Sequence, residues 1–225
     1  MDYSQLPVLL SLAFGLGLLH SLDADHIMAV SNLASGQSVK TNVQFCLRWA
    51  LGHGLTLFII GMLVFALGIS LPEQLSLYAE RCVALVLILL GLYVLYDVLR
   101  RRIHIHFHQH DDQPKHAHWH SHAKQASHRH NHTALFVGML HGLAGSAPLL
   151  ALIPISMTQQ PRYGFIYLMI FSLGVIVSML LFGGLLGMVS KHVIEYSEKA
   201  FRIVRAVLGL GAMTIGSIIL LGTVA

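Results

Sequence analysis

The sequence has very little formal charge for its length. Of its 225 residues, 11% are Asp, Glu, Lys or Arg, whereas an average soluble domain carries about 25%. The 14 basic and 10 acidic side chains cannot cover the surface of a water-soluble globule in which 55% of the residues are hydrophobic. This deficit excludes an ordinary cytoplasmic enzyme, a nucleic-acid-binding protein and a disordered chain. It predicts an all-α integral membrane protein.

Cysteine is also scarce, and several sequence motifs are missing. Cys46 and Cys82 are too few for a disulfide framework and do not form a CxxC motif. There is no Walker A motif, so the chain carries no nucleotide-driven motor of its own. The N-terminus has no basic segment and no small-residue cleavage site after its apolar run, so we expect no cleaved signal peptide. No prosthetic group and no enzymatic activity are predicted.

Long apolar segments predict six transmembrane helices, because a span needs about 20 mainly apolar residues. The segments are Leu6–Leu33, Trp49–Leu71, Tyr78–Leu99, Thr133–Thr158, Tyr163–Ser190 and Ala206–Ala225. If the N-terminus lies outside, 12 of the 14 Lys and Arg residues fall on the cytoplasmic side. The positive-inside rule therefore predicts a protein of the bacterial cytoplasmic (inner) membrane with both termini outside.

The two halves of the chain resemble each other. Residues 17–22 (GLLHSL) match residues 138–143 (GMLHGL) at an offset of 121. Two further pairs fall at nearly the same offset: residues 51–52 with 173–174, and Arg81 with Arg202. Each half contains three predicted spans, an odd number, so the second half crosses the membrane in the opposite sense. This pattern predicts two inverted repeats, which are common in secondary transporters.

The predicted organisation has three parts. The first three-helix repeat covers residues 1–103, a histidine-rich loop covers 104–132, and the second three-helix repeat covers 133–225. Binding sites of transporters with inverted repeats lie near the middle of the membrane, where the repeats meet. Polar residues within the spans are therefore the first candidates for function.

The first predicted span contains a polar segment, residues 20–26 (HSLDADH). An Asp at the centre of a span costs about 2.5–3.5 kcal/mol, so two of them need a cation, a partner or water. Imidazole and carboxylate ligands together suit divalent first-row metal ions. Positions 20, 25 and 26 do not share one face of a regular helix, so a common site predicts a break in the helix here. The candidate ligands are His20, Asp23, Asp25 and His26, and the alternative is a solvated turn near one membrane interface.

Two more histidines lie in predicted spans. His53 stands between two glycines, and it completes the metal shell, hydrogen-bonds to a ligand or bonds to a neighbouring helix. His141 corresponds to His20 in the second half, but residues 144–147 carry no acid or histidine. His141 is therefore a weaker ligand, a gate or a structural residue.

Eleven of the 16 histidines lie in the loop formed by residues 104–132. They are His104, His106, His108, His110, His116, His118, His120, His122, His128, His130 and His132. Few apolar residues accompany them, so we expect the loop to be disordered without a ligand. Neutral imidazoles bind nickel, cobalt, zinc or copper, which predicts an auxiliary metal-collecting loop on the cytoplasmic side. A polar spacer is the alternative.

Residues 20–26 match the His-x4-Asp-His signature of the nickel/cobalt transporter superfamily, and residues 51–53 (LGH) resemble its second, Gly-His-containing motif. The resemblance implies that His20, Asp25, His26 and His53 take part in metal selection and passage. The chain lacks the polar Asp/Thr/Glu motif of the high-affinity uptake members and has six predicted spans instead of eight. It therefore resembles the shorter branches, the urease-accessory-type permeases and the nickel/cobalt efflux proteins.

The sequence thus predicts a transporter of nickel or cobalt ions, with zinc as an alternative substrate, that works by alternating access around an intramembrane His/Asp site. Uptake and efflux both fit. The expected partners are divalent metal ions and the lipid bilayer, and no metallochaperone or accessory subunit can be assigned from the residues.

Two other functions also fit the sequence. One is a metal sensor or chaperone-like membrane protein that binds without transport. The other is a membrane electron carrier that uses haem or paired thiols. The thiol form is disfavoured, because the positions that correspond to Cys46 and Cys82 in the second half are Leu168 and Ile203.

Overall fold

The structure is a computed structural model that describes residues 6–67, 73–100, 106–108, 116–118, 130–144 and 161–223. Within these residues the regular secondary structure is helical except for two three-residue strands. The helices are α1 (Leu6–His20), α2 (Ala24–Ala34), α3 (Val39–Leu67), α4 (Glu73–Arg100), α5 (His130–Leu143), α8 (Pro161–Tyr196) and α9 (Glu198–Gly222). The strands are β1 (His106–His108) and β2 (His116–His118).

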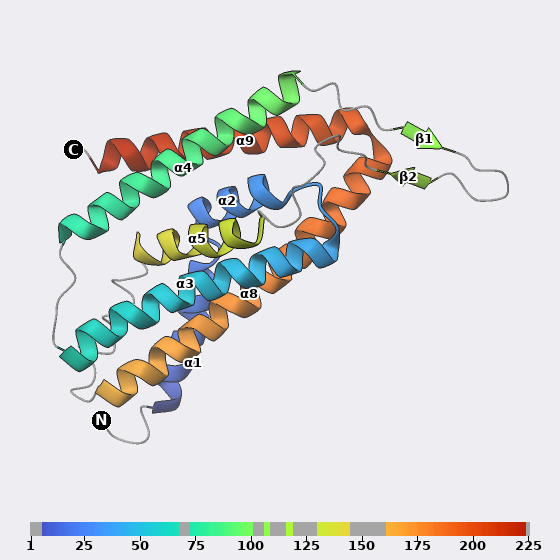
Figure 1. Ribbon diagram of the computed structural model, residues 1–225. Coiled ribbons are helices and arrows are strands. Elements are labelled where there is room, and N and C mark those ends of the chain that lie inside the picture. Colours follow the sequence, from blue (N-terminus) through green and yellow to red (C-terminus); the bar gives the residue numbers. More distant parts are fainter. Residues whose placement is uncertain are drawn as a thin grey trace.

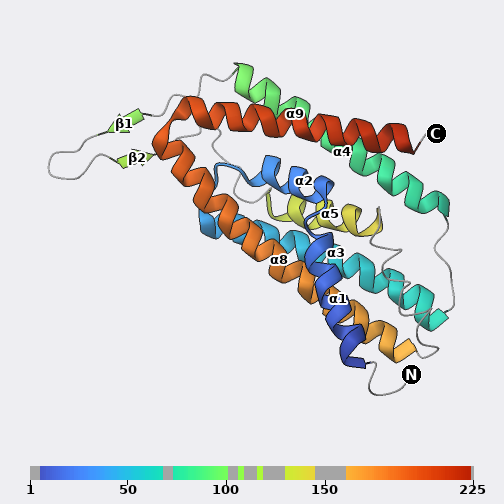
Figure 2. The ribbon, with the colours of Figure 1, turned by 180° about the vertical axis from the view of Figure 1, so that it is seen from behind.

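The helices form two layers with two short helices between them (Figure 1). One layer is the antiparallel pair α4 and α9, and the other contains α3 and α8. Helix α1 packs against α8, as the view from behind in Figure 2 also shows. The short helices α2 and α5 lie between the layers, where α2 contacts α4 and α9 and α5 contacts α3 and α4. The middle of the molecule is thus built from short helices enclosed by long ones.

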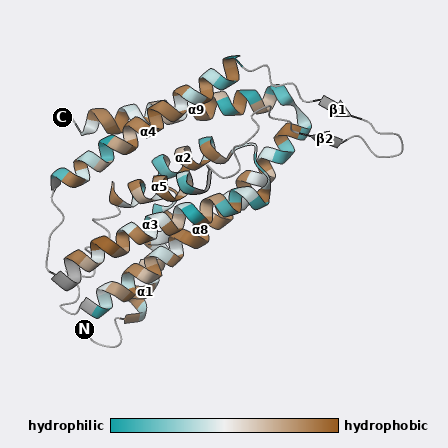
Figure 3. Ribbon diagram, in the orientation of Figure 1, coloured by the Kyte–Doolittle hydropathy of each residue, from teal (hydrophilic) through white to brown (hydrophobic). Residues whose placement is uncertain are grey.

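Four helices are long and apolar enough to cross a membrane: Val39–Leu63, Gln74–Arg100, Arg162–Tyr196 and Glu198–Gly222. The pair α1 and α2 makes a fifth candidate span if its two bent halves are counted as one. Apolar residues dominate the long helices in Figure 3, and large apolar side chains such as Leu89 and Leu181 face outward. An outward apolar surface of this extent suits lipid instead of water. The protein is therefore an integral membrane protein.

Five of the six predicted spans correspond to these helices. The remaining segment, Thr133–Thr158, is described as far as Ala144, and the rest of it lies outside the described residues. Helices α3 and α9 begin before the predicted spans Trp49–Leu71 and Ala206–Ala225. A helix can continue beyond its apolar stretch where hydrogen bonds satisfy the backbone groups at its end. The Ser197 side chain accepts a hydrogen bond (3.3 Å) from the Ala200 N–H at the start of α9.

The predicted break in the first span is present. Helix α1 ends at His20, α2 begins at Ala24, and the two axes differ by 53°. A turn covers the break, in which the Leu22 N–H donates to the Leu19 carbonyl (2.9 Å) and the Asp23 N–H donates to the His20 carbonyl (3.1 Å). These short-range bonds satisfy backbone groups that would otherwise be left without partners at membrane depth.

Two described segments of the histidine-rich loop form paired strands, whereas disorder is predicted for the loop. Strand β1 pairs antiparallel with β2, with His106 opposite His118 and His108 opposite His116. Histidine alternates with an apolar residue in both segments, and this alternation favours an extended strand. Helix α5 begins at His130, so His130 and His132 belong to a helix and not to the loop. The other loop histidines lie outside the described residues: His104, His110, His120, His122 and His128.

Charged groups hold α4 and α9 together at both ends of the pair. The Arg205 side chain donates to the Asp97 carboxylate (2.9 Å), and both side chains are largely buried. At the opposite end, Arg81 donates to the carbonyl of Thr223 (2.8 Å), just after the last turn of α9. Breaking the buried Asp97–Arg205 pair would leave an uncompensated charge, so this pair, together with the Arg81 contact, keeps α4 and α9 in one register.

Glycines allow α1 and α8 to approach each other closely. A Cβ atom on Gly17 would overlap the carbonyl oxygen of Phe171, and one on Gly174 would overlap the carbonyl oxygen of Phe14. Small residues at such crossings are typical of helix pairs in membranes.

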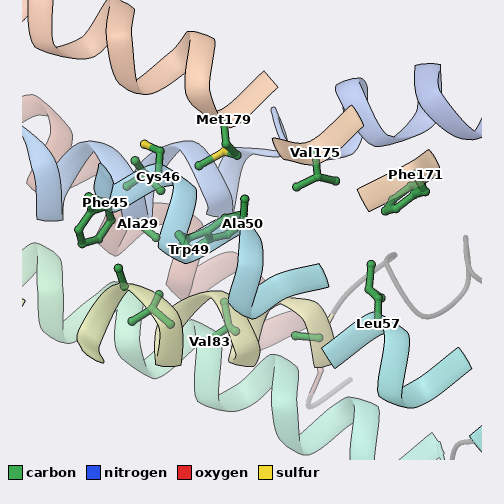
Figure 4. Close-up of a cluster of buried hydrophobic side chains, with 14 of the residues drawn as sticks. Ala29, Phe45, Cys46, Trp49, Ala50, Leu57, Val83, Phe171, Val175 and Met179 are labelled. Atoms are coloured by element: carbon green, nitrogen blue, oxygen red, sulfur yellow. The ribbon is translucent and has the colours of Figure 1, made fainter. Parts of the chain in front are cut away.

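The same kind of contact joins α3 and α5. A Cβ atom on Gly52 would overlap the carbonyl oxygen of Leu135, and one on Gly138 would overlap the carbonyl oxygen of Trp49. Trp49 is fully buried at the centre of the apolar cluster, close to residues of α2, α4 and α8 (Figure 4). These contacts fix the position of α3 relative to the short helices.

We predict that Gly17→Ala destabilises the protein more than Gly15→Ala, a matched change on the same helix. The Cβ atom at position 17 has no room, whereas nothing lies within 4 Å of a Cβ atom at position 15. Overpacking costs about 1–3 kcal/mol, which corresponds to a fall in Tm of about 2–12 °C. Thermal unfolding in detergent measures the difference, and equal Tm values for the two variants would contradict the packing described.

Candidate metal site

The break between α1 and α2 brings two histidines of the polar segment together. His20 is the last residue of α1 and His26 lies in the first turn of α2, and their ring centroids are 4.7 Å apart. His53 of α3 approaches the same point, with ring centroids 5.1 Å from His20 and 5.5 Å from His26. All three side chains are buried.

The three histidines offer ring nitrogens that lie within 4.8 Å of one another. The Nε2 atoms of His20 and His53 are 3.1 Å apart. With metal–nitrogen bonds of about 2.0–2.1 Å, two ligands stand about 2.9 Å apart at a right angle and about 3.3 Å apart at a tetrahedral angle. The observed separation therefore fits two imidazoles on one metal ion.

Carboxylates occupy the opposite side of two of these rings. Asp23 Oδ2 lies 3.0 Å from His20 Nδ1, and Asp25 Oδ1 lies 2.9 Å from His26 Nδ1. A carboxylate can only accept, so each Nδ1 carries the proton and each Nε2 keeps its lone pair. Carboxylates on the outer nitrogens of histidines commonly orient the rings of metal ligands.

Several buried nitrogens at this point have no hydrogen-bond partner among the described residues: His26 Nε2, His53 Nδ1, His141 Nε2 and Trp49 Nε1. A buried polar atom without a partner costs about 1–3 kcal/mol. His26 Nε2 and His141 Nε2 belong to rings whose Nδ1 is already engaged, by Asp25 and by the Val137 carbonyl, and these two atoms suit the binding of a cation. His53 meets His20 through Nε2 instead.

His141 lies beside the three histidines but outside their group. It is buried on α5, its Nδ1 donates to the Val137 carbonyl (2.8 Å), and its ring centroid is 5.1 Å from that of His26. The Nε2 atom of His141 therefore keeps its lone pair and points away from the Val137 carbonyl. The structure places His141 next to His26 as a candidate fourth imidazole.

The two acids form a second group with His26 instead of joining the three histidines. Ligand atoms of Asp23, Asp25 and His26 lie within 4.8 Å of one another. The Asp23 side chain is 45% exposed and that of Asp25 is 21% exposed. All six residues predicted from the sequence thus lie in one region. Three form the buried imidazole group, His141 lies beside it, and the two acids form the more exposed group with His26.

Trp49 is a residue of this region that motif reasoning misses. Its indole stacks on His53 (centroids 5.3 Å apart) and lies edge-on to His26 (4.8 Å). It also lies 5.6 Å from the His141 ring. The spacing of four residues between Trp49 and His53 puts both on one face of a helix, and this spacing was the available signal.

The fold and the site define a helical membrane protein with a buried cluster of histidines at a break in one span. The chain belongs to the family described as "Cytochrome C biogenesis protein transmembrane region", whose model matches residues 12–211. This match covers most of the chain. No solved structure matches it.

Two curated relatives connect the chain with nickel proteins. It is 29% identical over 190 residues to the urease accessory protein UreH of Bacillus sp. (strain TB-90), covering 83% of this chain and 79% of that one. It is 34% identical over 79 residues to the high-affinity nickel transport protein of Cupriavidus necator, covering 33% of this chain and 22% of that one. The resemblance predicted from residues 20–26 is confirmed.

We predict that Ni²⁺ or Co²⁺ quenches the fluorescence of Trp49, because the indole contacts the candidate ligands. The Trp119→Phe background removes the other of the two tryptophans. His53→Ala should raise the apparent Kd about 10-fold or more, since an altered ligand environment typically costs 10–100-fold in affinity.

The exposed His192→Ala variant is the matched control, because it removes an imidazole far from the cluster in sequence and on the surface. Titration at buffered free metal concentrations measures the apparent Kd of both variants. Equal Kd values for the His53 and His192 variants would show that the buried cluster does not bind the metal.

Proposed function

We propose that the protein transports a divalent transition-metal ion, nickel in the first place, across the membrane. The observation that carries this proposal is the buried group of His20, His26 and His53 at a break in one span. Broken helices at membrane depth are where transporters bind their ions. Both relatives named above are connected by their names with nickel or with urease accessory function, and this supports nickel as the substrate.

The chemistry of the group favours nickel and cobalt, with zinc as an alternative. Imidazole nitrogens suit these ions, whereas Mg²⁺ and Ca²⁺ prefer oxygen ligands. The carboxylates of Asp23 and Asp25 supply negative charge next to the buried rings. A dication held by neutral imidazoles alone would lack this compensation in a low-dielectric environment.

Alternating access would follow from an inverted repeat, and the glycine contacts support one. Each of these contacts joins a residue of the first half to a residue of the second half. The offsets of 121 and 122 noted above convert one contact into another. Gly17 with Phe171 corresponds to Gly138 with Trp49, and Gly174 with Phe14 corresponds to Gly52 with Leu135. We propose that residues 1–103 and 133–225 are the two repeats, which rock against each other around the histidines.

The basic residues support the predicted orientation. Figure 1 shows the N-terminal ends of α3 and α9 and the C-terminal ends of α4 and α8 at the same end of the molecule. Seven of the described Lys and Arg residues lie near these ends: Lys40, Arg48, Arg100, Lys191, Lys199, Arg202 and Arg205. Arg81 and Arg162 lie near the other end. We propose that the first end, from which the histidine-rich loop emerges, is cytoplasmic.

The energetics differ between the two directions. A membrane potential of 100 mV is worth about 4.6 kcal/mol for a dication and favours uptake. Efflux would need coupling to another gradient, since the sequence has no motif for nucleotide hydrolysis. In either direction the loop histidines would bind metal on the cytoplasmic side.

The geometry argues against a haem-based electron carrier. Two ligands on opposite sides of one iron atom stand about 4 Å apart, twice a metal–nitrogen bond. The His20 and His53 nitrogens are 3.1 Å apart and leave no room for a porphyrin between them. The thiol alternative has one buried cysteine, Cys46, and one exposed cysteine, Cys82, both as free thiols.

We predict that Asp25→Asn lowers Ni²⁺ flux into sealed proteoliposomes by about 10–100-fold at subsaturating metal, the usual cost of disturbing a carboxylate behind a metal-binding histidine. Expression should be nearly unchanged, because an amide oxygen still accepts from His26 Nδ1. The control is Glu195→Gln, which neutralises an exposed carboxylate on α8. Normal flux in the Asp25 variant would refute the site, and wild-type protein that binds Ni²⁺ without flux would favour the sensor alternative.

We also predict that deletion of residues 104–129 changes the apparent affinity or the capacity for metal but leaves transport intact. This deletion ends before α5 begins at His130, so the helix that carries His141 is kept. Flux at saturating Ni²⁺ should stay within about 3-fold of the wild type, because the buried group is unchanged. Complete loss of flux in a variant that still elutes as a folded protein would contradict an auxiliary role for the loop.

A further inference from the structure

We propose that the metal ion passes through two stations that share His26. The outer station is the group Asp23, Asp25 and His26, and the inner station is the group His20, His26 and His53. This inference rests on the proposed function, because it describes the order in which a transported ion meets its ligands.

Exposure decreases from one station to the other. The Asp23 and Asp25 side chains are 45% and 21% exposed, whereas the side chains of His20 and His26 are 2% exposed. His53 is fully buried. We therefore expect a hydrated cation to reach the carboxylates first and to reach the imidazoles only after it has lost water.

His26 has one ring nitrogen on each side. Its Nδ1 lies 2.9 Å from Asp25 Oδ1, on the side of the outer station. Its Nε2 is buried without a hydrogen-bond partner in the described part of the chain, and its ring packs against His20 and His53.

The two stations differ in ligand chemistry, and this difference gives selectivity. Carboxylate oxygens accept hard and borderline cations alike, so the outer station would admit most divalent ions. Imidazole nitrogens favour nickel, cobalt, copper and zinc, so the inner station would retain these and reject Mg²⁺ and Ca²⁺. Because Nδ1 and Nε2 point to opposite sides of the His26 ring, the ion leaves the outer station before His26 Nε2 binds it in the inner station.

The experiment that tests this uses stopped-flow quenching of Trp49 by Ni²⁺ in the full-length Trp119→Phe protein. Trp49 contacts both His26 and His53, so it reports occupancy of either station. We expect two phases, a first whose rate rises linearly with Ni²⁺ concentration and a second whose rate is independent of it.

Two variants separate the stations. His53→Ala, measured at Ni²⁺ concentrations above its raised Kd, should keep the first phase and lose the second. Asp23→Asn should slow the first phase about 10-fold, because the attracting charge is lost, while the second phase keeps its rate. Asp23→Glu keeps the carboxylate and should recover most of the first-phase rate, and Glu195→Gln should match the wild type.

A single phase that both variants affect equally would overturn the proposal, as would an unchanged first phase in Asp23→Asn. The flux assay above distinguishes this failure from failure of the proposed function. Wild-type flux with single-phase quenching refutes only the two stations, whereas absence of wild-type flux refutes transport itself.

Discussion

The Nε2 atoms of His20 and His53 meet at 3.1 Å, and this contact depends on the break between α1 and α2. A continuous helix would carry residues 20, 25 and 26 around its circumference. The turn at residues 21–23 bends the chain by 53°, so that the histidine before the turn and the histidine after it both lie close to His53 of α3. The two acids then lie behind the imidazoles, where they orient the rings and balance charge.

The surrounding helices hold this arrangement by close packing. Glycines on α1, α3, α5 and α8 bring backbones into contact on both sides of the cluster. Trp49 fills the space between three histidine rings, and it is fixed in turn by the approach of Gly138. Because membrane helices gain little from burying apolar surface against one another, such contacts and the polar cluster itself specify the fold.

The sequence predicted the class of fold and most of the candidate site. The excess of apolar residues located five described spans, and two Asp residues in an apolar segment marked the break. The sequence alone could not predict which polar residues face the interior and which hydrogen-bond to the outer nitrogens of the histidines. His20 and Asp23 are three residues apart and could have formed one shell, but the turn places the carboxylate on Nδ1 and leaves Nε2 for the interior. The role of Trp49 was missed, since a buried aromatic residue is ordinary in a core. The pairing of β1 with β2 depends on contacts between residues eight to twelve positions apart, which a composition argument for disorder does not consider.

The most direct test of the buried metal site is an anomalous difference map from crystals of the protein grown with Ni²⁺ and measured at the nickel absorption edge. We expect a peak about 2.1 Å from the Nε2 atoms of both His20 and His53, the usual length of a bond between imidazole and such a metal. Peaks confined to the histidine-rich loop, with none among the buried rings, would contradict it.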